Sequence, residues 1–370
     1  MPYEPLPAST VHAYDITTGR HLTRLPYTSC TWNDGINEPG SMSVTIDYTR
    51  TAAGQGLRSI LRCWNVILAI QRGNQVLHAG PLTDLDWDAE TRRLSLTCGG
   101  GLTLLTKRLA INATLKDTWR DRSVMTDEQH PAGDLALTLT GSYPDIIRGL
   151  VAEAMRWGTL PISLPATEGG SYTRTWYAWD LATIADRIQD ITSLEDGPET
   201  RFDPRTVDDG SLVYDLRCAS EIMDHAWRWN AIVPGQRVIY QGLSGDGSSM
   251  TSQVWLTGGK DDDKTLMCRR TSGLDTTGML LMTADTSHTT VSYMKTLQQC
   301  AIGDLERHAW PAETHKLKVG EEHDVRVGDT IDLTIGDDYM GVTTLNLRAT
   351  DISGDASSDW LTVQAQERTE

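Results

Sequence analysis

The sequence lacks the features that mark metal-binding, disulfide-rich and membrane-spanning proteins. Its six cysteines lie far apart and form no C-x-x-C pair, so neither a zinc site nor a dense disulfide framework is indicated. We therefore expect free thiols in a reducing compartment. The longest apolar run, residues 64–70, is far too short to cross a bilayer. Phenylalanine occurs once, against 12 tryptophans and 11 tyrosines, and these amphipathic rings suit strand faces and subunit contacts.

Positive charge is also scarce. The chain carries 33 Lys and Arg against 50 Asp and Glu, which gives a formal net charge of -17. Because affinity for nucleic acids rests on basic residues at phosphates, specific DNA or RNA recognition is not expected. The first ten residues, MPYEPLPAST, have neither a basic n-region nor an apolar h-region, so we expect no signal peptide and synthesis in the cytoplasm.

The clearest local pattern is an early strand. In GINEPGSMSVTIDY, residues 35–48, a turn is followed directly by Met42, Val44 and Ile46 in alternation with small polar residues. This alternation predicts a half-buried strand with no catalytic side chain in it. Similar signals run from residue 10 to residue 107, with hairpin turns predicted at residues 18–19 and 72–74. We expect a β domain at each end of the chain and a mixed α/β region between them.

Three helices are predicted by apolar residues at helical spacing, and they lie in residues 142–158, 179–197 and 291–311. Pro144 is placed as the first residue of the first helix. In the second, Asp180 is the predicted N-cap and Leu181 begins the apolar stripe, with Gly197 as the end. Pro311 closes the third helix. Two polar stretches of the intervening β-rich segment, SGDGSSMTS and TGGKDDDKT, are expected to be exposed loops.

No motif predicts a catalytic, cofactor-binding or metal-binding residue, and no cofactor is expected. The acidic run from Lys260 to Lys264, together with Asp246, lacks the D-x-[DN]-x-[DN]-G spacing of a calcium loop, so a solvated loop is expected. The nine histidines form no H-E-x-x-H or H-x-x-H pattern. CGGGLTLL, residues 98–105, has neither phosphate-loop nor dinucleotide-fold spacing, and we interpret it as a flexible exit from the first β domain.

The order of several segments resembles the tail-hub (minor tail) proteins of long non-contractile-tailed phages, which are related in fold to the baseplate hub of contractile phages. The most telling segments are NEPG with its following strand, and GNQVLHAGPLTD at residues 73–84. The wider resemblance covers residues 11–46, 66–100, 253–266 and 326–335 in order. Together these segments span nearly the whole chain.

The resemblance implies a mainly β fold with α/β insertions, built on two tube-like antiparallel β-barrel domains. Residues 1–107 would form the first barrel and residues 306–370 the C-terminal part of the second. Residues 108–305 would form an intervening mixed α/β region that contributes some strands to the second barrel. The early alternating strand would then wall a channel and pair with its neighbours.

The implied function is structural and not enzymatic. A homotrimer would form a ring at the tail tip of the virion, closing or continuing the tail tube, adapting six-fold to three-fold symmetry and letting genomic DNA pass without specific binding. The implied partners are the distal tail protein ring, the tape measure protein and further tail-tip or receptor-binding proteins. Because the chain ends at residue 370 without a long extension, we expect the hub alone.

Two other classes of function stay open on sequence. One is a tail-associated cell-wall hydrolase, because paired carboxylates for glycoside cleavage leave little trace in sequence. A serine hydrolase is less well supported, since GLSGDGSS only approximates G-x-S-x-G and no apolar helix follows. The other is a carbohydrate-binding module that uses the tryptophan-rich surface.

Overall fold

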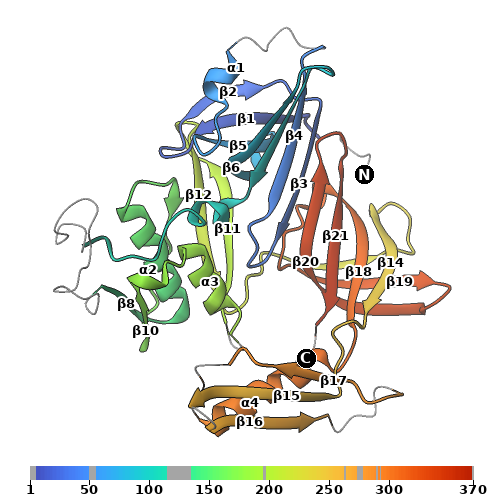
Figure 1. Cartoon of the computed structure of the whole chain (residues 1–370). Coiled ribbons are helices and arrows are strands. Elements are labelled where there is room, and N and C mark those ends of the chain that lie inside the picture. The colour runs from blue at the N-terminus through green and yellow to red at the C-terminus, as the bar shows by residue number, and fades with distance from the viewer. Residues whose placement is uncertain are drawn as a thin grey trace. The chain divides into compact units, whose positions relative to one another are not determined.

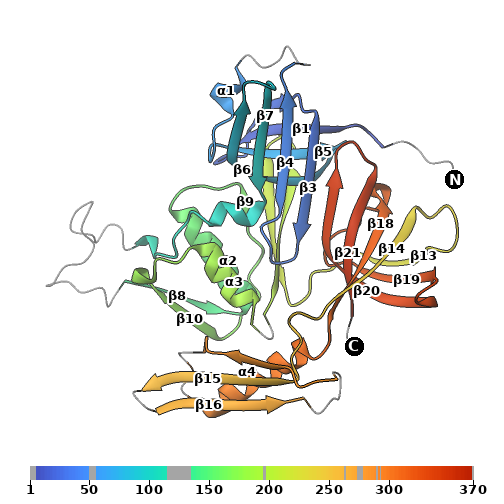
Figure 2. The ribbon, with the colours of Figure 1, turned by 45° about the vertical axis from the view of Figure 1, so that its right-hand side comes forward.

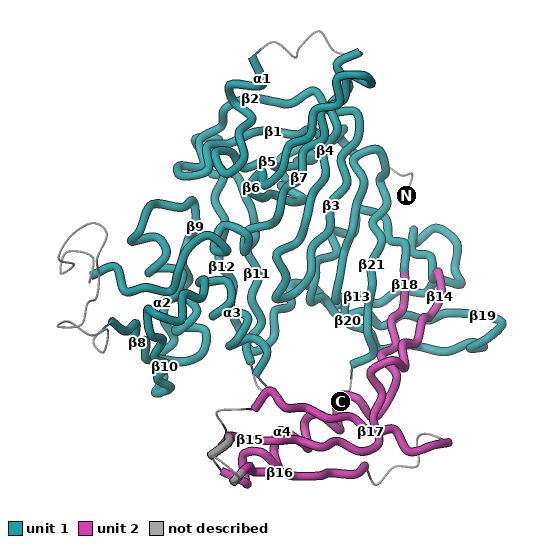
Figure 3. Tube along the Cα trace, viewed as in Figure 1, with its two compact units in different colours: residues 1–240, 317–368, 370 teal, residues 241–316, 369 magenta. Residues whose placement is uncertain are grey.

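The computed structural model describes residues 6–49, 56–114, 135–194, 197–261, 264–272, 278–288, 291 and 293–368. The chain divides into two units, shown in Figure 3: residues 1–240 with 317–368, and residues 241–316. The domain boundaries expected at residues 107 and 305 stay a prediction. Among the described residues no helix is both long enough and apolar enough to span a membrane.

The N-terminal part of the first unit consists of strands and tight turns, as the sequence predicts. The strands lie side by side in the order β2, β1, β5, β6, β7, β4, β3, and Figure 2 shows the last four together. Gly73, with φ of 60°, occupies the two-residue turn between β5 and β6, because a left-handed backbone favours glycine. The elements are β1 (Ser9–Asp15), β2 (His21–Leu25), β3 (Ser29–Gly35), β4 (Ser41–Asp47), α1 (Leu57–Ile60), β5 (Val66–Arg72), β6 (Gln75–Asp88) and β7 (Arg93–Gly99).

The last strands of the chain form a second group with two strands from its middle. β14, β18, β21 and β20 follow one another, and β19 pairs with both β20 and β13. β13 and β19 run parallel, whereas β19, β20 and β21 are antiparallel neighbours. The bounds are β13 (Ala226–Asn230), β14 (Val238–Asp246), β18 (Ala312–Gly320), β19 (Thr330–Asp337), β20 (Gly341–Asp355) and β21 (Trp360–Glu367).

β20 joins the two groups of strands (Figure 1). Its first residues pair with β19, and residues 351–355 pair with β3. β20 has 15 residues against 8 in β19, so part of it extends past that neighbour and pairs with β3 instead. The result is one continuous sheet of 13 strands, which confirms a mainly β fold. In the described residues this sheet closes no barrel, so the description as two barrels is not confirmed.

Residues 136–219 add two helices and short sheets. Ser142 caps α2 by accepting a hydrogen bond from the Asp145 backbone N–H, and Pro144 lies in the first turn. Ile146, Leu150 and Ile184 on the helices pack with Tyr214 and Ile67 from the strands in one buried cluster. The elements are β8 (Ala136–Gly141), α2 (Tyr143–Arg156), β9 (Ile162–Ser163), β10 (Tyr172–Tyr177), α3 (Ile184–Thr192), β11 (Glu199–Thr206) and β12 (Leu212–Ala219).

The start of α3 differs from the prediction. Thr183, and not Asp180, is the N-cap, because Thr183 and Asp186 cap each other's backbone N–H and satisfy two orphan donors at once. Asp180 instead pairs with Arg187 at 3.0 Å. Leu181 does not join the apolar stripe, since it has φ of 50° and 64% of its surface is exposed. The helix ends before Gly197, at Thr192.

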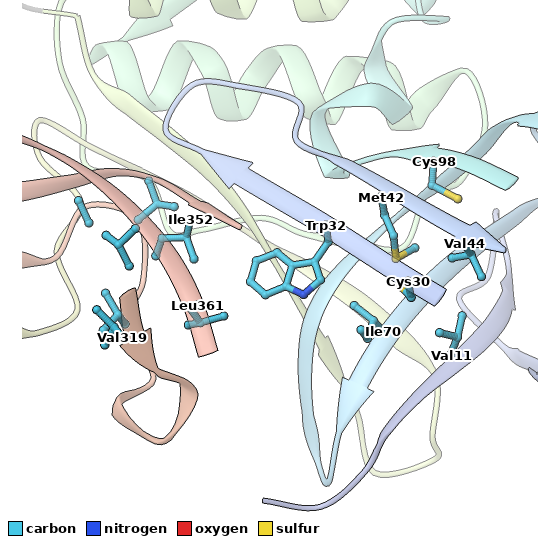
Figure 4. Close-up of a cluster of buried hydrophobic side chains, with 14 of the residues drawn as sticks. Val11, Cys30, Trp32, Met42, Val44, Ile70, Cys98, Val319, Ile352 and Leu361 are labelled. Atoms are coloured by element: carbon cyan, nitrogen blue, oxygen red, sulfur yellow. The ribbon is translucent and has the colours of Figure 1, made fainter. Parts of the chain in front are cut away.

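The main core of the first unit lies on one side of the continuous sheet. Figure 4 shows side chains from both groups of strands in this cluster, with Trp32 and Met42 from the N-terminal strands and Ile352 and Leu361 from β20 and β21. All six cysteines are free thiols. Cys30 lies within this core, and burial raises the pKa of its thiol to about 12.

The glycines after β7 are closely packed, contrary to the expectation of a flexible exit. A Cβ on Gly80 would lie 1.5 Å from the Gly99 carbonyl oxygen, so the two backbones touch. A Cβ on Gly101 would lie 2.4 Å from Cβ of Phe202 in β11. The chain continues in a buried 3₁₀ turn at Gly101–Leu105. Glycine is required here by close approach of backbone and side chain.

The second unit contains a three-stranded sheet with one helix, in addition to the parts of β14 and β18 that fall within residues 241–316. α4 confirms the third predicted helix, and Leu297, Ala301 and Leu305 on it pack against Val254 and Leu256. The stretch TGGKDDDKT lies in the β15–β16 hairpin and is not a loop throughout; residues 262 and 263 lie outside the described residues. The bounds are β15 (Gln253–Asp261), β16 (Lys264–Thr271), β17 (Met282–Asp285) and α4 (Met294–His308).

Candidate functional site

In β3, β4, β7 and the second half of β6 one face of the sheet is polar, while the opposite face of these strands belongs to the core. β4 exposes Ser43 and buries Met42 and Val44 on its other side. The strand register places Ser43 beside Thr31 of β3 and beside Thr97 of β7, so small polar side chains continue from strand to strand. We call this surface the polar face; it comprises Ser29, Thr31, Asn33, Ser41, Ser43, Thr45, Asp84, Asp86, Asp88, Arg93, Ser95, Thr97, Ser353 and Asp355.

The polar face is acidic. It carries four aspartates and one basic residue, Arg93. Asp88 accepts hydrogen bonds from the side chain and backbone of Thr91, which lower the pKa of its carboxyl and keep it ionised at neutral pH. A surface of this composition repels polyanions at distances up to roughly 8–10 Å at physiological salt. Apart from Arg93, the side chains of the polar face are short.

The NEPG turn attaches one end of the polar face to β11. Asn37 has φ of 60°, and its side-chain oxygen accepts a hydrogen bond of 2.7 Å from the backbone N–H of Thr200 in β11. Gly40, with φ of 63°, leaves no room for a side chain, because a Cβ would lie 2.6 Å from Asp34 Oδ1 and 2.9 Å from the Asn33 carbonyl oxygen. The turn therefore sets both the β3–β4 connection and its attachment to β11.

The segment GNQVLHAGPLTD, residues 73–84, contains a buried histidine. His78 Nδ1 lies 2.9 Å from Asp34 Oδ1, and Nε2 lies 3.1 Å from the carbonyl oxygen of Gly99. The ring of Trp32 stacks on it at 6.3 Å between centroids. Burial lowers the pKa of His78, but Asp34 and the Gly99 carbonyl raise it by more, so that the net pKa lies above its ordinary value.

A cleft of about 510 Å³ lies beside these two segments, between β3, β11, β12 and residues 321–327. Arg201 on its wall binds Asp203 through Nε at 2.5 Å, contacts Asp224, and donates to the Val327 carbonyl oxygen at 2.7 Å. Burial raises the pKa of Asp224, but Arg217 and Arg201 outweigh it and hold the pKa at about 2. The arginines of this wall are thus neutralised by carboxylates, and the network ties β11 to the C-terminal segment.

Glu321 also lines the cleft. Its Oε2 lies 2.8 Å from Arg72 Nη1, and each of the two side chains is only 8% exposed. Burial raises the pKa of Glu321 to about 7, although Arg72 opposes this shift. A carboxyl group with a near-neutral pKa in a cleft is suited to general acid catalysis, but structural ion pairs show such shifts as well. Arg72 also donates to the Ser358 carbonyl oxygen at 2.9 Å, so the pair connects β5 to the C-terminal strands.

The prediction of no catalytic, cofactor or metal residue stays a prediction. Asp246 forms a local turn with the Ser248 backbone N–H, and His323 contacts the Gln236 carbonyl oxygen at 2.8 Å. Sequence reasoning missed the polar face as a surface, although Ser and Thr alternate with apolar residues in β3, β4 and β7 and could have revealed it. It also missed the cleft, whose residues come from several segments that lie far apart in the sequence.

Several aromatic side chains are exposed, Tyr339 and Tyr293 the most, and some of the others form stacked pairs. Tyr177 and Trp179 stack on each other at 4.4 Å with an angle of 11° between their planes. Tyr172 stacks in the same way on Tyr143, at 4.5 Å and 2°. Each pair leaves at most one outer face per ring for stacking on a carbohydrate.

The fold is similar to that of phage tail proteins. The 43 kDa tail protein of prophage MuSo2 from Shewanella oneidensis superimposes with a TM-score of 0.56 at 8% identity, over 97% of this chain and 98% of that one. A tail protein from Neisseria meningitidis MC58 gives a TM-score of 0.49 at 14% identity, over 97% of both chains. The sequence matches no family model and none of the curated proteins.

Proposed function

We propose that this chain is a structural protein of a phage tail tip, in which three copies form a hub ring that closes or continues the tail tube. The proposal rests on the polar face, because this face is a broad acidic surface of short side chains with one basic residue. The similarity in fold to a prophage tail protein supports a role in a tail. The role is structural and not enzymatic.

In this ring the polar face lines the lumen. DNA then passes a negatively charged surface that repels its phosphates. Contacts between basic residues and phosphates, which would retain the DNA, are thereby avoided. Each chain contributes two groups of strands joined by β20. Three chains contribute six such groups, which is the number needed to match a six-fold tube on one side and three-fold components on the other.

The proposed neighbours are those of a tail tip. On the tube side they are the distal tail protein ring and the tape measure protein, and on the outer side further tail-tip or receptor-binding proteins. The protein is located in the virion, and genomic DNA passes through the lumen without specific binding.

The mass of the purified protein in solution and an image of the assembly test this proposal. Light scattering is expected to give three times the chain mass of 40.9 kDa, and the image a ring whose opening is lined by the polar face. The free protein is expected to show no measurable affinity for double-stranded DNA at about 0.15 M salt. A ring with the polar face on its outside, or tight salt-sensitive DNA binding, would refute the conduit even if the trimer formed.

A cell-wall hydrolase is the alternative, and Glu321 in its cleft is the observation that favours it. A turbidity assay on purified cell walls separates the two functions. We expect no lysis. Reproducible lysis that Glu321→Gln abolishes, while the exposed Glu313→Gln leaves it intact, would establish the hydrolase instead.

A further inference from the structure

Three metal-ligating side chains meet in the unit formed by residues 241–316. Asp285 is the last residue of β17, His288 follows it by one short turn, and Asp304 lies on α4. One ligand atom of each residue lies within 4.8 Å of the other two, and all three residues are half-buried. In Figure 1, α4 lies along β15 and β16. The packing of α4 brings Asp304 to the others, which is why no sequence spacing predicts the cluster.

The imidazole of His288 faces one of the two carboxylates. Its Nε2 is buried and lies 3.2 Å from Asp285 Oδ2, in an ion-pair contact. Two adjacent ligands of a tetrahedral zinc ion, with bonds of about 2.0–2.1 Å, lie about 3.3 Å apart. The separation of these two atoms therefore fits joint coordination of one small ion.

The two carboxylates keep an oxygen for the same ion. Asp285 accepts the Ser287 backbone N–H at its Oδ1, at 2.7 Å, and its Oδ2 is the oxygen that lies beside His288. Asp304 Oδ1 accepts from Arg307 Nη2 at 3.0 Å, which leaves its second oxygen. Arg307 is 59% exposed and can turn toward solvent when a cation enters.

We propose that Asp285, His288 and Asp304 bind one divalent transition-metal cation, with zinc as the best match. Imidazole and carboxylate ligands suit first-row cations of this kind, and water completes the coordination. The ion would connect the end of β17 to α4 in a unit whose buried cluster has only five residues in the described part. This inference does not depend on the proposed role in a phage tail.

Calorimetric titration of the chelator-treated full chain with zinc chloride tests the site. We expect one equivalent to bind, and His288→Gln and Asp304→Asn each to weaken binding at least about tenfold, since even residues behind metal ligands have effects of that size. Asp246→Asn is the matched control, because Asp246 makes the same turn with a Ser backbone N–H, at 2.8 Å, outside the cluster. This control is expected to leave the affinity unchanged.

Cobalt in place of zinc gives a second, spectroscopic readout. Visible d–d bands of tetrahedral cobalt in the unmodified protein support the site, and their loss in His288→Gln assigns them to the cluster. The His12 and His21 rings, with nitrogens 3.0 Å apart, are the rival binding place. Absence of zinc binding, or binding that His21→Gln removes and the cluster variants do not, would overturn the proposal.

Discussion

At the scale of single residues, His78 couples folding to pH. Its pKa is raised in the folded protein, so its contribution to stability is present below the unfolded value of 6.5 and is lost as the pH rises through the folded value. The free energy of unfolding should therefore fall with increasing pH above 6.5, by at most about 1.4 kcal/mol per pH unit from this group.

Urea titrations of the native protein and of His78→Gln between pH 6 and 8.5 measure this slope. The variant is expected to be less stable and to have a flatter pH dependence in this range. Glu321 titrates in both proteins, so its effect cancels in the difference between them. Equal slopes would show that His78 does not carry the dependence.

Gly40 is the second residue whose identity the fold requires. Gly40→Ala should reduce the free energy of unfolding by about 1–3 kcal/mol more than Gly210→Ala, since a Cβ at Gly40 collides with Asp34 and the Asn33 backbone. Gly210 is matched to it, with φ of +79° and nothing within 4 Å of its Cβ position, so both variants share the left-handed backbone penalty. Chemical denaturation of the two variants is the measurement; similar losses would mean that the turn relaxes around the methyl group.

At the scale of elements, β4 has one face buried in the core and one face exposed to solvent. Ile46→Ala removes a fully buried side chain and is expected to cost about 2–5 kcal/mol. Ser43→Ala, on the polar face, should change stability by no more than about 0.5 kcal/mol. Thermal or urea unfolding of the two single variants compares the faces. A large loss in Ser43→Ala would mean that the polar face is packed against something in the free protein.

Which elements were predictable depends on how local their causes are. The alternation in β4 reports a single buried face, and the sequence shows it directly through Met42, Val44 and Ile46. The beginning of α3 was misplaced because two capping sites compete, and the reciprocal pair of Thr183 and Asp186 prevails. The cleft and the cluster around His288 could not be predicted, since each is assembled from segments that only the folded chain brings together.

At the scale of the whole molecule, the two units differ in the size of their cores. The first unit contains two extensive buried clusters, and the second has a cluster of five buried residues in the described part of the chain. Because local opening follows the amount of buried apolar contact, amides of β15 and α4 should exchange with deuterium earlier than those of β4 and β5. Mass spectrometry of peptides under native conditions measures this order, and simultaneous exchange in both units would contradict it.

The sharing of β20 between two groups of strands has a mechanical consequence. Residues 351–355 of β20 pair with β3, while β21 pairs with residues 347–354 of β20. A pull that separates the two groups along the strand direction loads this ladder in shear, so that several backbone bonds must break together and not one after another. The pairing of β20 with β3 therefore resists a pulling force cooperatively. Because β20 belongs to both groups of strands, a force on one group is transmitted to the other through its backbone.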